Sequence, residues 1–256
     1  MIHASAIVDP TASIAPGVSI GPFSVIGPGV EIGQDTWIGP HVVIKGPTRI
    51  GKRNKIFQFS SIGEDPQDKK YRGEITYLKI GDDNVIREYV TIHRGTVQDQ
   101  GLTQIGDGNL LMAYSHVAHD CIIGDQIIMA NAASLAGHVC VESHAILGGF
   151  TLVHQFCRIG QHSFSGMGSV ISRDIPPYVM VGGSPTKPRG INTVGLERRG
   201  FDADSVLNVK RAFKILYKSR LKLEEAIESL SASAADAPIV MPMVDFLRKS
   251  GRSIIR

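Results

Sequence analysis

Aliphatic residues recur at every sixth position along the first quarter of the chain. Eleven successive positions of this series are Ile or Val: Ile2, Val8, Ile14, Ile20, Ile26, Ile32, Ile38, Ile44, Ile50, Ile56 and Ile62. In a chain that is 43% hydrophobic, chance would produce this run in one phase roughly once in ten thousand trials. A period of six fits neither an α-helix nor an alternating strand. It predicts a β-solenoid with three flat walls, each about six residues long, so that one coil takes about 18 residues.

The series continues after two interruptions. It returns first at Ile80, Ile86 and Ile92, and then in a shifted phase at Ile105, Leu111, Val117, Ile123, Met129, Leu135, Val141, Leu147, Val153, Ile159 and Ile171, broken by Ser165. We expect these side chains to point inward and to stack from coil to coil about 4.8 Å apart, which suits a chain with few aromatic residues. Glycine follows the aliphatic residue at 21, 27, 33, 39, 51 and 63, and we expect it to permit the turn at a corner.

The two interruptions, at about 64–78 and 94–104, are polar segments, and the repeat returns after each of them. They therefore predict excursions from a corner of the solenoid. Long loops on a rigid scaffold often carry function, although an ordinary solvated insertion would have the same composition.

The repeat stops near residue 188, and a helical period replaces it. We expect a β-solenoid domain over 1–188 and a small helical C-terminal domain over 189–256. Three apolar stripes predict its helices: Val206, Val209, Phe213 and Leu216; Leu223, Ala226, Ile227 and Leu230; and Met243, Phe246 and Leu247. Asp202 or Asp204 is available as the N-cap of the first helix.

Charge and cysteine content narrow the function classes. The net charge of +3 is too small to indicate nucleic acid, and no apolar run is long enough to span a membrane. The N-terminus lacks the features of a signal peptide, and the three cysteines lack metal-type spacing, so we expect reduced thiols and a cytoplasmic protein.

Residues 189–222 hold nine Lys or Arg against three Asp or Glu, a local net charge of +6. This segment suggests an acidic partner or a phosphorylated ligand, or else an ordinary solvated face.

The candidate catalytic residues belong to a cluster of histidines. Six of the nine fall in one stretch: His116, His119, His138, His144, His154 and His162. A coil of about 18 residues places positions near 119, 138 and 154 on successive coils of one wall. His119 has Asp120 beside it, and a histidine with a carboxylate partner is the usual general base near neutral pH. His144 and His162 are expected to be ordinary hydrogen-bonded surface residues. The cluster also permits a zinc site shared between subunits, as in γ-type carbonic anhydrases.

Several segments together carry a resemblance: Val90–Thr96 (VTIHRGT), His116–Asp120 (HVAHD), Leu135–His138 (LAGH), Val153–Phe156 (VHQF) and Gly195–Phe201 (GLERRGF). With the repeats, they resemble the acyl-[acyl-carrier-protein]–UDP-N-acetylglucosamine O-acyltransferase family nearly end to end. The resemblance implies a homotrimer of left-handed parallel β-helices with active sites between neighbouring subunits. It implies transfer of an (R)-3-hydroxyacyl group from acyl carrier protein to the 3-hydroxyl of UDP-N-acetylglucosamine, the first step of lipid A biosynthesis. No metal or dissociable cofactor, nucleic acid or stable membrane insertion is expected.

The resemblance also assigns roles to residues. His119 matches the general base, Asp120 its carboxylate partner, and Gly137 the backbone N–H donor to the oxyanion. The residues that match contacts to substrate are His116, His138, His154, Asp68 and Lys70, with Gln67 and Gln155 beside them, and Asn192 and Arg198 from an adjacent subunit, with Arg199 assisting. Met167 matches the position that limits the acyl chain, which favours 3-hydroxydecanoyl over 3-hydroxytetradecanoyl. The basic residues Lys210, Arg211 and Lys214 are expected to bind the acidic carrier protein.

Two departures from the family pattern stand out. Val194 occupies a position that is often acidic in relatives, and Pro185 one that is histidine in some; the first puts one nucleotide contact in doubt.

Three alternative functions remain. A related glucosamine N-acyltransferase would need an N-terminal nucleotide-binding domain, for which repeats that begin at Ile2 leave no room. The others are a zinc lyase of the carbonic anhydrase type and a non-catalytic scaffold.

Overall fold

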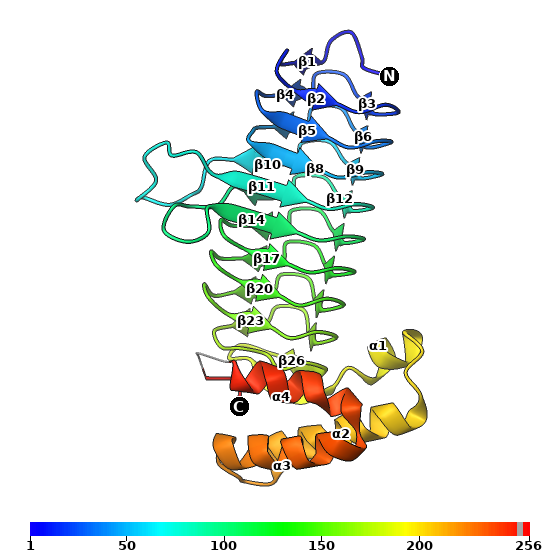
Figure 1. Ribbon diagram of the computed structural model, residues 1–256, viewed down its shortest axis with the longest axis vertical. Coiled ribbons are helices and arrows are strands. Elements are labelled where there is room, and N and C mark those ends of the chain that lie inside the picture. The colour runs from blue at the N-terminus through cyan, green and yellow to red at the C-terminus, as the bar shows by residue number, and fades with distance from the viewer. Residues whose placement is uncertain (250–252) are drawn as a thin grey trace.

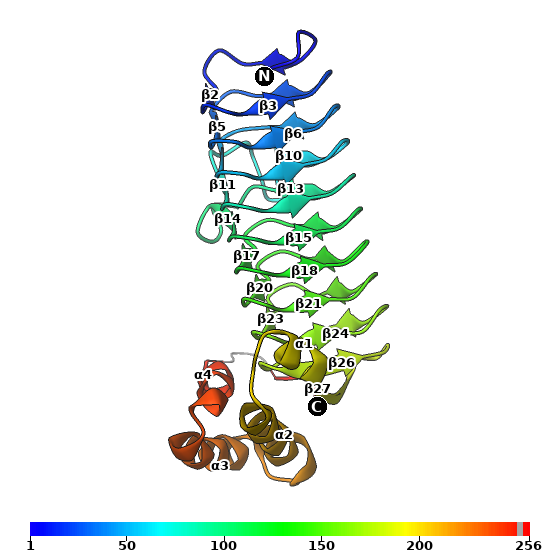
Figure 2. The same ribbon diagram turned by 90° about the vertical axis from the view of Figure 1, so that its right-hand side faces the viewer.

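Three parallel β-sheets form the walls of a long prism, and helices cover its lower end (Figures 1 and 2). This computed structural model describes residues 1–249 and 253–256. Wall A contains β3 (Ser19–Ile20), β6 (Trp37–Ile38), β9 (Lys55–Ile56), β12 (Val85–Ile86), β15 (Leu110–Leu111), β18 (Ile128–Met129), β21 (Ile146–Leu147), β24 (Phe164–Ser165), β26 (Val179–Gly182) and β27 (Lys187–Ile191).

Walls B and C complete each coil. Wall B contains β1 (Ile7–Val8), β4 (Val25–Ile26), β7 (Val43–Ile44), β10 (Ser61–Glu64), β13 (Thr91–His93), β16 (His116–Val117), β19 (Ser134–Leu135), β22 (Leu152–Val153) and β25 (Val170–Ile171). Wall C contains β2 (Ser13–Ile14), β5 (Val30–Ile32), β8 (Thr48–Ile50), β11 (Tyr77–Ile80), β14 (Leu102–Ile105), β17 (Ile122–Ile123), β20 (Cys140–Val141) and β23 (Arg158–Ile159).

The aliphatic series forms the core, as the sequence predicts. Ile44 pairs in register with Ile26 and Ile62, and all three are almost fully buried. The break at Ser165 is accommodated because its hydroxyl contacts Thr151 Oγ1 at 2.9 Å and accepts the Gly148 N–H. Ile2 is an exception at 47% exposure, because no coil of the described chain covers it from above.

The predicted role of glycine at the corners is wrong. The left-handed backbone angles belong mainly to other residues, such as Phe59 with φ of 62°. Of the glycines that follow the aliphatic series at 21–63, Gly63 alone has such an angle, 75°. Gly33 is needed for another reason: a Cβ there would lie 2.5 Å from the carbonyl of Gly51 on the next coil. Glycine thus permits close approach between successive coils rather than the turn itself.

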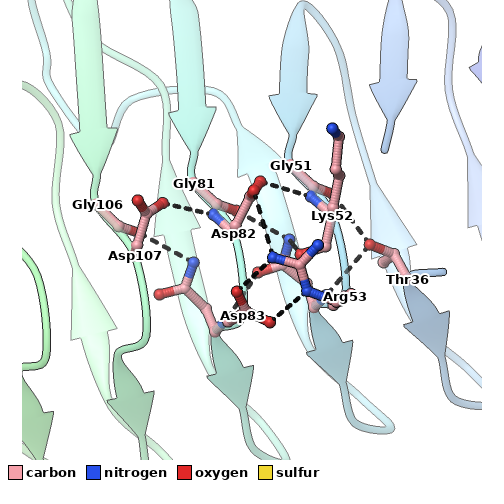
Figure 3. Close-up of polar contacts among 11 residues, drawn as sticks. Thr36, Gly51, Lys52, Arg53, Gly81, Asp82, Asp83, Gly106 and Asp107 are labelled. Carbon is pink, nitrogen blue, oxygen red and sulfur yellow. Dashed lines mark hydrogen bonds and ion pairs between the residues drawn. The ribbon is translucent and has the colours of Figure 1, made fainter. Parts of the chain in front are cut away.

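Polar side chains form ladders along the corner between walls C and A (Figure 3). Asp82 Oδ1 accepts the Lys52 N–H at 2.7 Å, and the Asp82 N–H donates to Asp107 Oδ1 at 2.6 Å. Arg53 forms an ion pair with Asp83 at 2.6 Å. These contacts join successive coils and satisfy backbone donors that the turns leave unpaired.

Both excursions leave the solenoid at the corner between walls B and C. Residues 65–76 connect β10 to β11, and residues 94–101 connect β13 to β14. Arg94 ties them together: its buried guanidinium donates to the Gly63 carbonyl, to Asp65 and to the Tyr71 hydroxyl. The two excursions therefore pack as one layer beside this corner.

The three predicted helices are present as α2 (Ala203–Lys218), α3 (Leu223–Asp236) and α4 (Met241–Arg248), the last preceded by a 3₁₀ turn at Pro238–Val240. Asp202 caps α2 by accepting the Ser205 N–H at 2.7 Å. The sequence did not predict the short α1 (Thr193–Arg198), and the expected boundary at residue 188 falls inside β27.

The last coil of the solenoid pairs with other segments of the chain instead of a further coil. β27 runs antiparallel to β26, and Ile254 forms a bridge with Asp174. Among the described residues, no helix combines the length and apolar character that a bilayer crossing requires.

Candidate active site

Register brings the key residues of the B/C corner together. Val117, Leu135 and Val153 pair in sequence along wall B. His119 and Gly137 therefore occupy equivalent places on successive coils, two residues beyond this row. Asp120 and His138 occupy the next place along the turn, as the coil length predicts.

His119 and Asp120 form a hydrogen-bonded pair. His119 Nδ1 lies 2.8 Å from Asp120 Oδ2, and the carboxylate side chain is 1% exposed. Asp120 also accepts the Thr96 N–H at 2.8 Å and the Thr96 hydroxyl at 2.6 Å. Burial alone would raise the pKa of Asp120, but the hydrogen bonds from His119 and Thr96 hold it below its usual value. The charged carboxylate requires a proton on Nδ1, which leaves the Nε2 lone pair of His119 available.

Gly137 lies directly against the His119 ring. A Cβ at residue 137 would come within 2.6 Å of His119 Cε1 and 2.8 Å of Nε2. Among the residues that the structure describes, none accepts a hydrogen bond from the Gly137 N–H. A backbone donor and a basic nitrogen therefore adjoin one small space, which is the arrangement that acyl transfer requires.

Two further histidines surround this pair. The His138 ring lies 5.1 Å from the His119 ring in an edge-on arrangement, stacks on Phe156 at 4.4 Å, and bonds through Nδ1 to Asp99 at 2.8 Å. His116 Nδ1 lies 2.7 Å from Thr91 Oγ1. Burial, reinforced by nearby His93 and His119, lowers the pKa of His116 to about 4. His116 is consequently neutral near physiological pH.

His119, Asp120 and His138 also have the residue types of a metal site, with one ligand atom from each lying within 4.8 Å of the others. Their hydrogen bonds fit a metal poorly. Nδ1 of each histidine faces a carboxylate, and both oxygens of Asp120 already accept hydrogen bonds. The arrangement favours a histidine base with a fixed carboxylate.

The other predicted substrate contacts of this corner lie around it. Gln67, Asp68 and Lys70 are on the first excursion, where Asp68 Oδ1 accepts the Lys70 N–H at 2.9 Å. Within the described chain, no hydrogen bond or ion pair joins these three to His119 or Asp120. His154 and Gln155 are exposed on the next coil, where His154 Nδ1 lies 3.1 Å from the Gln155 carbonyl oxygen.

The predicted nucleotide contacts lie elsewhere, over wall A. A cavity of about 730 Å³ is lined by Ile128, Ile146, Phe164, Met180, Ile191, Asn192, Thr193, Val194, Gly195, Arg198 and Arg199. Asn192 is buried, and its amide is already engaged: it accepts the Gly195 N–H as the N-cap of α1 and donates to the His162 carbonyl at 3.0 Å. Arg198 is exposed, and burial lowers the pKa of Arg199. Within a single subunit, this cavity does not adjoin His119.

The remaining predicted residues are exposed. Met167 lies at the corner between walls A and B and is 79% exposed. Lys210, Arg211 and Lys214 project from α2 and, with Lys218, line a groove of about 440 Å³ beside Leu207 and Phe213.

Sequence reasoning missed three contacts of the site: Thr96 on Asp120, Asp99 on His138, and Phe156 beneath His138. Phe156 could have been found, because it lies one coil of 18 residues after His138. Thr96 and Asp99 carry no periodic signal, since they belong to an excursion.

Comparison with known proteins gives a consistent result. Residues 174–255 match the family model described as Udp N-acetylglucosamine O-acyltransferase, domain 2. A relative from Thiobacillus denitrificans, named acyl-[acyl-carrier-protein]–UDP-N-acetylglucosamine O-acyltransferase, is 58% identical over 100% of this chain and 99% of its own length. A relative of the same name from Alkalilimnicola ehrlichii is 57% identical, again over 100% and 99% of the two chains.

Solved structures agree with the fold. The UDP-N-acetylglucosamine acyltransferase of Francisella novicida has a TM-score of 0.98 and 44% identity, covering 100% of this chain and 94% of that one. The corresponding enzyme of Moraxella catarrhalis has a TM-score of 0.97 and 44% identity, with coverage of 100% and 99%. The expected left-handed parallel β-helix with a small helical C-terminal region is confirmed, and the lyase alternative is not favoured. The chain belongs to the acyl-[acyl-carrier-protein]–UDP-N-acetylglucosamine O-acyltransferase family.

Proposed function

We propose that this enzyme transfers an (R)-3-hydroxyacyl group from acyl carrier protein to the 3-hydroxyl of UDP-N-acetylglucosamine, the first step of lipid A biosynthesis. The names of the full-length relatives support both substrates. The main support for the proposal is the geometry around His119. Its Nδ1 is held by buried Asp120, and its Nε2 lies beside the backbone of Gly137.

The reaction follows from this geometry. His119 Nε2 takes the proton of the sugar hydroxyl as its oxygen attacks the thioester carbonyl carbon. The Gly137 N–H stabilises the oxyanion of the tetrahedral intermediate. Collapse of the intermediate breaks the carbon–sulfur bond, and the imidazolium returns its proton to the leaving thiolate. Asp120 stabilises the imidazolium, and neutral His116 adds no repulsive charge.

Two features of the single subunit support a homotrimer with active sites between subunits. The cavity that holds Arg198 lies over wall A, whereas His119 lies at the B/C corner. An exposed aromatic ladder follows the A/B corner, and each ring lies 4.8–5.4 Å from the next: Phe23, His41, Phe59, Tyr89 and Tyr114. Exposed apolar surface of this extent is typical of interfaces. In the proposed trimer, wall A of one subunit faces wall B of its neighbour.

The sharing of active sites between subunits is tested by mixing inactive subunits. His119→Ala and Arg198→Ala proteins are produced separately and together, and acyl transfer is measured at low UDP-N-acetylglucosamine concentration. Mixed trimers contain sites in which both residues are intact, so we expect coexpression to restore activity. No recovery in mixed trimers of confirmed composition would contradict shared sites.

The remaining substrate contacts proposed for these sites are Gln67, Asp68, Lys70, His116, His138, His154, Gln155, Asn192 and Arg199. We place the reaction in the cytoplasm, where the free thiols of Cys121, Cys140 and Cys157 would stay reduced.

Acyl carrier protein is proposed to bind the basic face of α2. Lys210, Arg211 and Lys214 are exposed there, and no acidic residue lines their groove. Reversing these charges should raise the KM for the carrier protein more than that for the sugar nucleotide, and added salt should weaken the wild-type enzyme in the same way. Equal effects on both substrates would remove this assignment.

Met167 is proposed to limit the acyl chain and to favour 3-hydroxydecanoyl over 3-hydroxytetradecanoyl. Its exposed side chain is available to fill the end of a groove between subunits. Each buried methylene is worth about 0.8 kcal/mol, so a groove that excludes several discriminates strongly. Met167→Gly should shift the preference toward longer chains, and an unchanged profile would place the limit elsewhere.

The decisive experiment incubates the enzyme and UDP-N-acetylglucosamine with a panel of (R)-3-hydroxyacyl carrier proteins and identifies products by mass spectrometry. The expected product carries one acyl ester at the sugar 3-position. Absence of acylated sugar nucleotide with every donor would overturn the proposed function.

A further inference from the structure

The second excursion contacts the catalytic pair from outside the solenoid. We propose that Thr96 is a positioning residue that locks the Asp120 carboxylate onto His119. This inference rests on the proposed function, because its effect is expressed through His119 as the base.

Thr96 holds Asp120 at both oxygens. Its backbone N–H donates to Oδ1 at 2.8 Å, and its hydroxyl donates to Oδ2 at 2.6 Å. The same Oδ2 accepts the His119 Nδ1–H at 2.8 Å. Two donors from one residue, aimed at two oxygens, fix the rotation of the carboxylate plane. Thr96 is 1% exposed, so water does not replace either bond.

This restraint on the Asp120 carboxylate matters because a second imidazole lies close to it. His138 Nδ1 is 3.9 Å from Asp120 Oδ2, against 2.8 Å for His119. A small rotation of an unrestrained carboxylate would bring Oδ2 toward His138 and weaken its bond to His119. Asp99, three residues after Thr96, already occupies His138 Nδ1 at 2.8 Å. The excursion thus fixes Asp120 with one residue and engages the competing ring with another.

The excursion is itself firmly held. The Gly95 N–H donates to the Tyr77 carbonyl at 3.1 Å, and the Thr96 carbonyl accepts the N–H groups of Asp99 and Gly101. Arg94, immediately before them, is buried against Asp65 and the Gly63 carbonyl. Thr96 therefore approaches Asp120 from a closed turn anchored on both sides, which is how a positioning group must be supported.

The test compares Thr96→Val with Thr96→Ser. Valine keeps the shape and the backbone N–H but removes the hydroxyl donor, whereas serine keeps the hydroxyl. We expect Thr96→Val to lower kcat by about tenfold to a hundredfold, because a misplacement of the base by about 1 Å has an effect of this size. The KM values for both substrates should stay within about twofold. Thr96→Ser should retain most of the wild-type kcat.

Thr151→Val is the matched control. Thr151 is also fully buried, and its hydroxyl contacts Ser165 in the core, away from Asp120. It should lower the thermal midpoint about as much as Thr96→Val without lowering kcat. The proposal is wrong if Thr96→Val keeps the wild-type kcat, if serine rescues no better than valine, or if the two valine variants lose kcat equally. Failure of the proposed function would instead appear as absence of acyl transfer by the wild-type enzyme.

Discussion

His138 and His162 occupy corner positions of the same solenoid with nearly the same backbone, φ of 62° and 56°, yet their side chains meet different neighbours. At the B/C corner, His119 and His138 each bond to a carboxylate, Asp120 and Asp99. At the C/A corner, His144 and His162 stack on each other at 4.6 Å, and their Nδ1 atoms are buried without a partner among the described residues.

The scaffold thus supplies the positions of these histidines, whereas the neighbouring residues determine their chemistry. Arg199 lies near the C/A pair, and burial together with this cation and the adjacent ring lowers the pKa of His162 to about 4. That histidine is neutral and stacked. The expectation of a hydrogen-bonded surface residue is wrong, because the His162 ring is buried among His144, Tyr178 and Phe201. The B/C pair differs because an excursion brings Asp99 and Thr96 to it.

The largest effect should come from removing a histidine at each corner. His119→Ala removes the base and should lower kcat by about 10² to 10⁴-fold, the usual contribution of a general base. His144→Ala removes a stacked ring and should leave kcat within about threefold of the wild type. Steady-state kinetics at saturating substrates measure both variants. Comparable losses of kcat in the two variants would show that the two corners do not differ in catalytic role.

A methyl group beside the base should have the next largest effect. Gly137→Ala places a Cβ 2.6 Å from His119 Cε1, so the ring must move, and kcat should fall by about a hundredfold. Gly149→Ala is the control, because its nearest atom would be 3.4 Å away and its backbone angle is ordinary. A Gly137→Ala enzyme with normal kcat would show that the position of His119 is not critical.

A smaller effect should appear in acid stability. The pKa values of His116 and His162 are lowered to about 4, below the ordinary 6.5, so the unfolded chain binds more protons than the folded one between these values. The contribution of these histidines to the free energy of unfolding is therefore present above about pH 6.5 and is lost as pH falls toward 4, by on the order of 1 to 3 kcal/mol for each group. His162→Phe keeps the stack but cannot titrate, so its unfolding free energy should depend less on pH across this window. Chemical denaturation at several pH values, with Gly149→Ala as reference, measures the slope; an unchanged slope would reject the assignment to His162.

Chelation should have the smallest effect. Asp120, His119 and His138 are engaged in hydrogen bonds, so acyl transfer should survive prolonged treatment with a chelator. Activity that disappears on chelation and returns with zinc would mean that this corner is a metal site after all.

The six-residue period was enough to predict the walls, the inward residues and the placing of His119, His138 and His154 on successive coils, because a regular coil converts sequence spacing into position. Gly137 came from the family resemblance and not from the period. The helices α2 to α4 followed from their apolar stripes. Thr96 and Asp99 could not be placed, since an excursion has no period. The function of Asn192 as a helix cap was also missed, because α1 is too short to show a helical pattern.

The reversal of the chain at the lower end affects how molecules meet one another. Each coil offers a parallel strand edge, and stacked edges of this kind invite head-to-tail polymerisation into a fibre. Here wall A ends in antiparallel β27, wall C ends against Ile254, and Val170 of wall B donates its N–H to Gly183 and accepts the Thr186 hydroxyl. A second molecule arriving with its first coil meets an antiparallel strand and terminal segments in place of the parallel edges that a further coil needs, so the chain itself disfavours growth along the solenoid axis.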